Sequence, residues 1–258
     1  MDIKIFDSHA HYDDESFNDD REAVIEDIKS KGVIGVLNCG ASLQGARGSV
    51  ELSKKYDMFY AAVGIHPEYA NEVTRDVLEE IEKLASFEKV RAIGEIGLDY
   101  YWDTNPPKET QKDAFRKQMA LAEKLNLPVV IHDRDAHEDI LNIMKEFPNV
   151  KGVVHCFSGS VEFSRECLKL GYYIGFTGVI TFKNAKKIIE VAKEIPLDRI
   201  LVETDCPYMS PSPFRGKRNQ SNYIKYIVEK IAEIKEIPVN DLNNQTISNI
   251  KELLSLKR

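Results

Sequence analysis

The stretch IKIFDSHAH, residues 3–11, decides the fold of this chain. Its first half is rich in isoleucine and phenylalanine, as in a buried strand, and its second half carries His9 and His11. Because side chains alternate along a strand, His9 and His11 leave the same face, while Ser8 and Ala10 take the other. The stretch therefore predicts a strand whose end presents two imidazoles together.

Seven further apolar runs follow along the chain, each closed by glycine, proline or aspartate. They are VIGVLNCG (33–40), FYAAVGIHP (59–67), VRAIGEIGLD (90–99), LPVVIHD (127–133), KGVVHCFSG (151–159), YYIGFTG (172–178) and RILVETD (199–205). Amphipathic segments separate them, for example residues 20–31, with Val24, Ile25 and Ile28 on one face, and residues 109–125. The chain thus alternates between predicted strands and predicted helices.

Eight such units, with strands that are apolar on both faces, favour one architecture. Strands covered on both sides need no polar alternation, as in a parallel sheet that closes into a (β/α)8 barrel. One barrel commonly fills 258 residues with 43% hydrophobic content, so we predict a single domain over residues 1–258. An additional C-terminal helix over 241–256, with Ile247, Ile250 and Leu254 on one side, is expected to pack against the outer ring. The predicted fold is an α/β, single-domain TIM barrel.

Composition and charge exclude several classes of protein. No apolar run reaches the roughly 18 residues of a membrane-spanning helix, and no secretory signal is recognised, so we predict a cytoplasmic protein without membrane association. The four cysteines show no CxxC spacing and indicate neither a disulfide framework nor a zinc ribbon. Lysine plus arginine number 35 and aspartate plus glutamate 42, and the net charge of −7 disfavours extensive coating of nucleic acid. Any nucleic-acid contact is expected to be local.

Imidazole and carboxylate side chains gather at the predicted strand ends, which form the active-site rim in barrels of this type. Such donors suit divalent ions, here Zn, Mn, Mg, Ni or Fe, and a set of more than four donors invites two ions. We predict that Glu95 bridges them. The other donors then divide into two groups: His9, His11 and Asp205 for one ion, and His132 and His155 for the other. Two such ions would acidify a bound water and stabilise the oxygens of a phosphoryl transfer.

Six motifs occur in a characteristic order: FDSHAH (6–11), GIHP (64–67), GEIGLDYY (94–101), VIHDR (130–134), VHCFSG (154–159) and ETDCPY (203–208). Over nearly its whole length the chain resembles the TatD family of metal-dependent deoxyribonucleases, among the amidohydrolase-like barrels. The resemblance implies metal ligands at His9, His11, Glu95, His132, His155 and Asp205. It also implies a substrate-facing role for His66 and exonucleolytic hydrolysis of DNA, which we expect at single-stranded or frayed ends.

Cations near the same rim predict contacts to phosphate. Arg134 lies two residues beyond His132, and the loop FRGKRNQ (214–220) contributes Arg215 and Lys217. We predict that these three cations bind substrate, because guanidinium and ammonium groups pair with phosphate oxygens. The alternative for the loop is a solvated, flexible segment.

The strand ends also predict roles beyond coordination. Asp205 is expected to accept a proton from the attacking water, which makes Asp205 and Glu95 the predicted catalytic residues. Glu203 lies two residues before Asp205, so it is expected to share its face and orient a ligand histidine. Cys156 and Cys206 adjoin predicted ligands but should point to the opposite face of their strands.

Several residues carry a second interpretation. Glu95 and Asp205 could belong to structural ion pairs, although metal binding would remove the cost of burying unpaired carboxylates. His66 could instead cap a neighbouring carbonyl at a turn. His137 stands outside the pattern and is expected to be a solvated surface residue.

Two other classes of function share this donor set. The first is a metal-dependent hydrolase of carboxylic esters or amides, such as an aminoacyl-tRNA deacylase, since an activated water attacks carbonyl carbon as well as phosphorus. The second is a non-enzymatic barrel that keeps metal as a structural element and binds a partner protein. The full complement of donors weighs against the second class.

Overall fold

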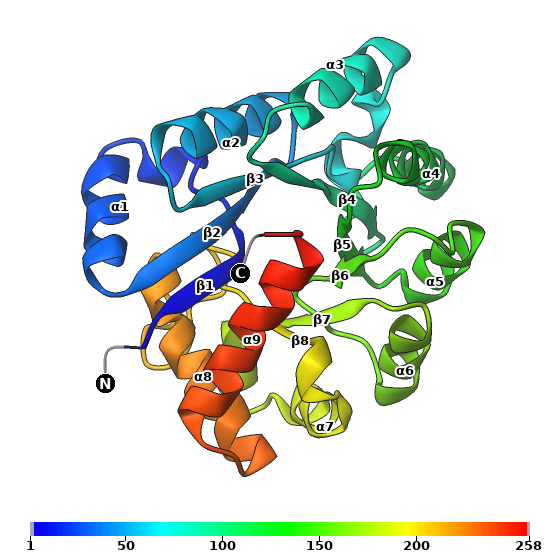
Figure 1. The fold of residues 1–258 in the computed structure, drawn as a ribbon. Helices are drawn as coiled ribbons and strands as arrows, with labels where there is room; N and C mark the ends of the chain where they lie inside the picture. Colours follow the sequence, from blue (N-terminus) through cyan, green and yellow to red (C-terminus); the bar gives the residue numbers. More distant parts are fainter. Residues whose placement is uncertain (1–2, 257–258) are drawn as a thin grey trace.

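The computed structural model describes residues 3–256, which form eight parallel strands alternating with helices (Figure 1). The strands pair with one another in chain order, from β1 to β8. Their bounds are Ile5–Ala10 (β1), Val33–Cys39 (β2), Phe59–Val63 (β3), Val90–Asp99 (β4), Val129–Arg134 (β5), Gly152–Val154 (β6), Tyr173–Phe176 (β7) and Ile200–Val202 (β8). The predicted TIM barrel is confirmed. The predicted domain range of 1–258 also includes residues 1–2 and 257–258, which lie outside the described part.

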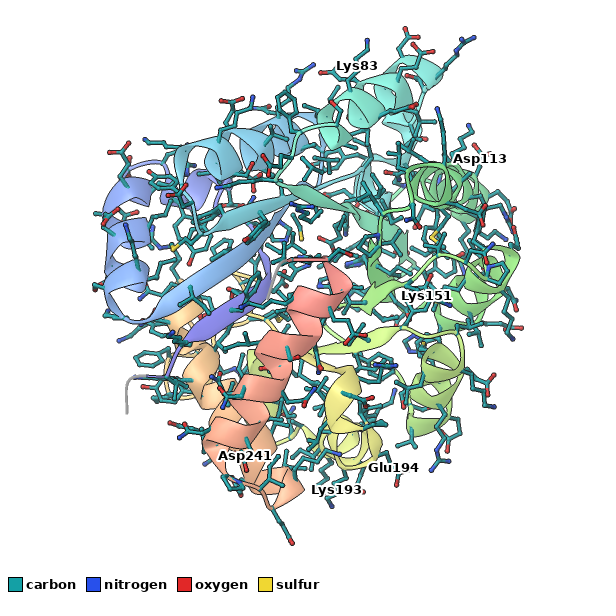
Figure 2. All side chains as sticks on the ribbon, viewed as in Figure 1. Lys83, Asp113, Lys151, Lys193, Glu194 and Asp241 are labelled. Carbon is teal, nitrogen blue, oxygen red and sulfur yellow. The ribbon has the colours of Figure 1, made fainter. Side chains whose placement is uncertain are left out.

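Helices cover the outside of the sheet, one after each strand. They are α1 (Arg21–Ser30), α2 (Leu43–Lys55), α3 (Arg75–Ala85), α4 (Lys108–Leu125), α5 (His137–Glu146), α6 (Val161–Lys169), α7 (Lys186–Glu194) and α8 (Ile224–Lys235), followed by α9 (Val239–Leu253). Short 3-10 helices occur at Glu15–Phe17 (η1), Pro67–Glu72 (η2), Gly178–Thr181 (η3), Leu197–Arg199 (η4) and Ser221–Tyr223 (η5). Charged side chains project outward from the helices, among them Lys83, Asp113 and Lys193 (Figure 2). Across residues 3–256, no helix is both long enough and apolar enough to span a membrane.

Helix α9 closes the amino-terminal mouth of the barrel. All eight strands contribute buried side chains to a cluster beneath this helix: Phe6, Leu37, Cys39, Ala62, Ala92, Val130, Val153, Tyr173 and Leu201. Ile250, Leu253 and Leu254 of the C-terminal segment complete the cluster, and Figure 1 shows α9 lying across the barrel. The expectation that this helix joins the outer ring is therefore wrong, although its apolar side was identified. The apolar side of α9 packs on the inside of the barrel because it covers a ring of apolar strand side chains that would otherwise face solvent.

The barrel closes between β1 and β8 at a short seam. Ala10 and Cys206 form an isolated parallel bridge. Two backbone hydrogen bonds flank it, from His11 N to Cys206 O at 2.8 Å and from Asp205 N to His9 O at 3.0 Å. The strands therefore join near their carboxyl ends, beside the predicted metal ligands.

A buried carboxylate reinforces this seam. Asp7 Oδ1 accepts hydrogen bonds from the amides of Thr204 (3.0 Å) and His9 (3.3 Å), and Oδ2 accepts from Thr204 Oγ1 (2.5 Å) and Ser221 Oγ (2.6 Å). Asp7, Thr204 and Ser221 are all buried. One side chain on β1 thus holds both the segment after β8 and the start of η5.

Replacing Asp7 with alanine is expected to lower the free energy of unfolding by about 3 kcal/mol or more, because four buried donors lose their acceptor. Urea denaturation followed by circular dichroism measures the change. Asp7→Asn should cost less, since the amide oxygen still accepts and both hydroxyl groups can reorient. A loss below about 0.5 kcal/mol, the range of neutral surface substitutions, for Asp7→Ala would contradict this role of the seam.

Candidate metal centre

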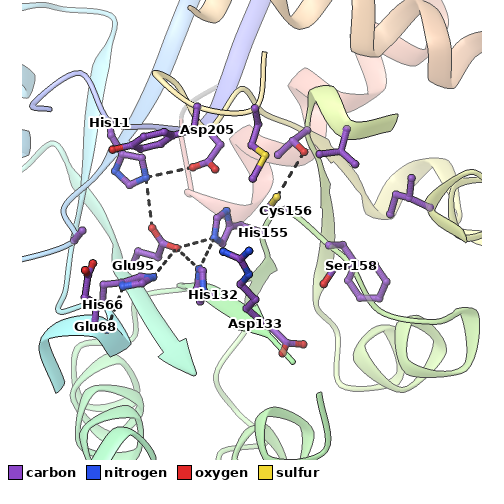
Figure 3. A pocket seen from close by; sticks show the side chains of 18 of the residues that line it. His11, His66, Glu68, Glu95, His132, Asp133, His155, Cys156, Ser158 and Asp205 are labelled. Atoms are coloured by element: carbon purple, nitrogen blue, oxygen red, sulfur yellow. Dashed lines mark hydrogen bonds and ion pairs between the residues drawn. The ribbon is translucent and has the colours of Figure 1, made fainter. Parts of the chain in front are cut away.

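The predicted donor residues meet at the carboxyl-terminal mouth of the barrel (Figure 3). Three of them lie on strands and three just beyond a strand end: His9 (β1), Glu95 (β4) and His132 (β5), then His11, His155 and Asp205. Parallel strands of a barrel end on one rim, so residues distant in sequence come together there. The structure brings all six together.

The first group of donors surrounds one carboxylate oxygen of Glu95. The Nε2 atoms of His9 and His11 are 2.9 Å apart. Glu95 Oε2 lies 3.3 and 3.5 Å from these two nitrogens, and Asp205 Oδ1 lies 3.5 and 3.4 Å from them. Donors placed tetrahedrally around a cation at bond lengths near 2.1 Å are about 3.4 Å apart. The spacing of this group therefore fits the coordination shell of a divalent ion.

The second group surrounds the other oxygen of the same carboxylate. Glu95 Oε1 lies 2.7 Å from His155 Nε2 and 2.9 Å from His132 Nδ1, and these two nitrogens are 3.3 Å apart. These distances also suit donors that share one cation. The two oxygens of Glu95 thus face two separate groups of histidines.

Neighbouring acceptors orient two of these histidines. His11 Nδ1 donates to the carbonyl of Cys39 at 2.8 Å, which leaves the Nε2 lone pair for the first group. His132 Nε2 donates to Asp99 Oδ2 at 3.1 Å, which leaves the Nδ1 lone pair for the second group. Hydrogen bonds of this kind fix the tautomer of a metal-binding histidine. The arrangement matches a metal centre better than a set of structural ion pairs.

Asp99 was missed by the sequence analysis. It is buried at the end of β4, four residues after Glu95. Strand alternation would have placed both carboxylates on one face. The spacing of the two acidic residues in GEIGLD therefore indicates Asp99 as well as Glu95.

Glu203 contacts one of the predicted ligand histidines, as expected. It is fully buried, its Oε1 accepts a hydrogen bond from the amide of Cys156 at 2.5 Å, and the same oxygen lies 3.6 Å from His155 Nδ1. The carboxylate therefore holds the backbone beside His155 and faces the outer nitrogen of that ring. This leaves Nε2 of His155 directed at Glu95.

His66 has the opposite hydrogen-bonding pattern. Its Nδ1 accepts from the amide of Glu68 at 3.2 Å, so the side chain caps an amide of η2 and not a carbonyl. Burial, with His132 nearby, lowers the pKa of His66 to about 3, so the ring is neutral and its proton sits on Nε2. Nε2 lies 3.8 Å from Glu95 Oε1. In this hydrogen-bonded form His66 presents an N–H donor beside the second group, close to Glu95 and His132.

The charges of the donors balance one another. Burial disfavours charge on Glu95, yet His155 and His9 outweigh it and hold the pKa of Glu95 well below its usual range. Burial likewise opposes charge on His11, but Asp205 and Glu95 raise its pKa to about 9. Without metal, protons on histidine therefore compensate the carboxylates.

Five of the six donors line a cavity of about 810 Å³, and His9 lies buried behind them. Arg134 of β5 and Lys187 of α7 are the basic side chains of its described lining, and Lys187 was not singled out from the sequence. Arg215 and Lys217 do not line it. Both are exposed, and the Arg215 guanidinium lies 4.6 Å from the ring centroid of Phe182. Their predicted substrate contact stays a prediction at the outer rim.

One expectation about side-chain direction is wrong. Cys156 lines the cavity, with Sγ 3.6 Å from Thr177 Oγ1, because β6 ends at Val154 and strand alternation no longer applies beyond it. His137 is partly exposed at the start of α5, and its Nδ1 also pairs with Asp133 Oδ2 at 2.7 Å. Cys206 is buried at the seam, away from the cavity lining, as expected.

A parallel barrel with histidines and carboxylates gathered at its carboxyl-terminal mouth defines a metal-dependent hydrolase. The family model described as TatD related DNase matches residues 6–255. The chain belongs to this family. The hydrolase class excludes the non-enzymatic, partner-binding alternative.

Individual relatives agree with this assignment. The Bacillus subtilis protein YabD, described as an uncharacterized metal-dependent hydrolase, is 48% identical over 98% of this chain and 99% of its own length. The Erwinia tasmaniensis 3'-5' ssDNA/RNA exonuclease TatD is 33% identical over 98% of this chain and all of its own. The crystal structure of the TatD homologue YjjV from Escherichia coli superposes over 100% of both chains with a TM-score of 0.93 at 30% identity.

Proposed function

We propose that this protein is an exonuclease that hydrolyses phosphodiester bonds of DNA at single-stranded or frayed ends, using two divalent ions. The observation that carries the proposal is the placement of Glu95, whose two oxygens each face a separate group of histidines within 3.5 Å. The activity named for the Erwinia relative supports the substrate class. A cytoplasmic location, as predicted from the sequence, accompanies this proposal.

The donor set divides naturally between two ions. His9, His11 and Asp205 would hold one ion. His132 and His155 would hold the other, and Glu95 would contact both. Zn, Mn, Mg, Ni or Fe would suit nitrogen and oxygen donors of this kind. When bound, such a pair activates water as a nucleophile and neutralises charge on a phosphate group.

Three residues would act directly on the substrate. Asp205 lines the cavity and has a pKa that burial tends to raise but His11 and His9 lower, so it is a carboxylate at neutral pH and accepts the proton of the attacking water. His66 donates its Nε2 proton to a phosphate oxygen. Arg134 holds a phosphate of the DNA backbone beside the scissile bond.

The surroundings of Arg134 support that role. Its guanidinium lies 4.0 Å from the ring centroid of Tyr101 and 5.4 Å from that of Trp102, and both rings are about half exposed. Within residues 3–256 it makes no ion pair, whereas Arg165 pairs with Glu194 at 2.7 Å. Stacking orders the guanidinium and leaves its donors available to phosphate.

Replacing Arg134 with glutamine is expected to raise KM for a DNA oligonucleotide about tenfold and to reduce the slope of log affinity against log salt by about one. Steady-state kinetics from low to high salt measures both. Arg165→Gln, a change of the same kind on the outer surface, should leave both values unchanged. An unaltered salt slope in Arg134→Gln would remove this residue from the phosphate contacts.

The outer loop gives a separate expectation. Neutralising Arg215 and Lys217 together should weaken substrate binding and flatten its salt dependence, because both are exposed cations beside the rim. The same salt series measures the effect. If the slope of the double variant equals that of the wild type, the loop lies outside the substrate path.

Metal binding is expected to weaken as pH falls. Below pH 9 the metal-free protein carries a proton on His11, whose pKa is raised to about 9, and this proton must leave before Nε2 can bind a cation. For each proton that the metal must displace, the apparent affinity falls by up to about tenfold for every unit by which the pH drops below the pKa. Competition with a chelating dye at pH 6, 7 and 8 measures the trend. An affinity for Zn that is constant over this range would contradict it.

Parallel assays test the proposed reaction itself. A single-stranded DNA oligonucleotide should be shortened stepwise from one end in the presence of Mg, Mn or Zn, and a chelator should stop the reaction. An aminoacyl ester of tRNA should remain intact under the same conditions. Rapid hydrolysis of that ester with intact DNA would overturn the proposal in favour of carboxylic ester chemistry.

A further inference from the structure

The cavity extends well beyond the donor residues, and this extension is apolar. Figure 3 shows Cys156 and Ser158 on the side of His155 away from His11 and His66. The wall of this side is lined by Phe157, Val179, Ile180, Ala185 and Ile188, which we call the apolar wall. These residues come from the loop after β6, from η3 and from the start of α7. The metal chemistry proposed above uses none of them.

A column of stacked rings holds the apolar wall in place. The ring of Phe157 stacks on Phe163, with centroids 5.5 Å apart, and Phe163 stacks on His137 at 4.8 Å. A Cβ atom at Gly159 would lie 2.4 Å from Phe163 and 2.8 Å from Phe157, so only glycine leaves room for this stack. Asp133 anchors the far end through its contact with His137. The wall is therefore preformed.

Polar groups border the apolar wall. Ser158, Thr177 and Asn184 line the same cavity. Asp133 also lines it, but its carboxylate is buried and pairs with His137. Apolar surface for a flat face, with polar groups for its edge, is the recognition chemistry of a heterocyclic base.

We propose that the apolar wall forms a subsite for one unpaired nucleobase, that of the nucleotide next to the scissile phosphate. The proposal rests on the exonuclease function above. The base lies against Phe157, Val179 and Ile188, and its edge meets Asn184 or Ser158. A paired base keeps its edge on the opposite strand, so the subsite admits only a frayed or single-stranded end.

Substrates with and without a base test the subsite. An intact single-stranded oligonucleotide is compared with two abasic versions of it. One version lacks the base of the terminal nucleotide, and the other lacks the base of the penultimate nucleotide. For one of these positions the wild type should cleave the abasic substrate with a kcat/KM about tenfold lower, mainly through KM. Equal kcat/KM for intact and abasic substrates at both positions would overturn the subsite while leaving the nuclease function standing.

A variant that fills the subsite sharpens the test. Val179 is partly exposed in η3, so Val179→Phe fills the space without emptying the core. It should lower kcat/KM for the intact substrate about tenfold and leave the abasic substrate within twofold of the wild type. Val239→Phe, the same change at a partly buried position at the start of α9, should leave both substrates unchanged. Equal slowing of both substrates by Val179→Phe would contradict the subsite.

A binding measurement separates this proposal from the nuclease function. Calorimetric titration of the metal-loaded protein with a deoxynucleoside monophosphate should show binding about tenfold tighter than with deoxyribose 5-phosphate, and Val179→Phe should remove the difference. This result without any cleavage of DNA would support the subsite and contradict the nuclease. Equal binding of the two compounds would overturn the subsite, whatever the protein does to DNA.

Discussion

Replacing Glu95 with alanine is expected to lower turnover on a single-stranded DNA oligonucleotide at least roughly a thousandfold, because its two oxygens face both groups of histidines. The metal content of the purified protein should fall below two ions per chain. Elemental analysis and single-turnover kinetics measure the two effects. The barrel should remain folded, since His11 and its neighbours can lose their protons when the carboxylate is removed.

Two further variants make the Glu95 result specific. Glu95→Gln keeps the size of the side chain and one neutral oxygen, so it should retain the fold and lose most of the turnover. Glu80→Ala, at an outer carboxylate that pairs with Arg47, should match the wild type in both metal content and rate. Undiminished turnover in a folded, metal-loaded Glu95→Ala protein would refute the bridging role.

Replacing Asp205 with asparagine is expected to lower kcat on DNA by roughly a thousandfold with little change in KM. The amide preserves the shape of the side chain and an oxygen beside His9 and His11, but it cannot accept a proton from water. Steady-state kinetics at saturating metal separates kcat from KM. The expected pattern is that of an interaction made only in the transition state.

Independent controls distinguish a loss of proton transfer from a loss of folding or of bound metal. Asp198→Asn, an exposed change of the same kind on η4, should leave kcat unaltered. Metal content and the midpoint of thermal unfolding should show that Asp205→Asn is folded and loaded. A kcat within threefold of the wild type in that protein would assign the proton transfer to another group.

The strand ends made the donor residues predictable. His9 lies on β1 and His11 just beyond its end, two residues apart, and Glu95 and His132 lie on strands whose apolar runs are unmistakable. Alternation along one strand is a local property, so it can be read without knowing any neighbour. The TIM barrel then explains why donors from different strands come together, because its parallel strands all end on the same rim.

Contacts between distant segments could not be read in this way. Ile250 and Leu254 were recognised as one apolar side, but their partners are Phe6, Leu37 and other side chains inside the barrel. Arg215 follows the eighth strand and still lies outside the cavity lining, against Phe182. A pattern of hydrophobic residues shows that a face is buried, and only the packed structure shows against what.

The sequence by itself determined the eight strand and helix units, the residues that gather as candidate metal donors, and the family. The tertiary structure alone decided that the oxygens of Glu95 face two different groups, that His66 offers a proton where the other histidines offer lone pairs, and that an apolar wall stands beside them. These features depend on distances between side chains from different strands and loops. Such distances follow from barrel closure and packing, which no local spacing in the chain encodes.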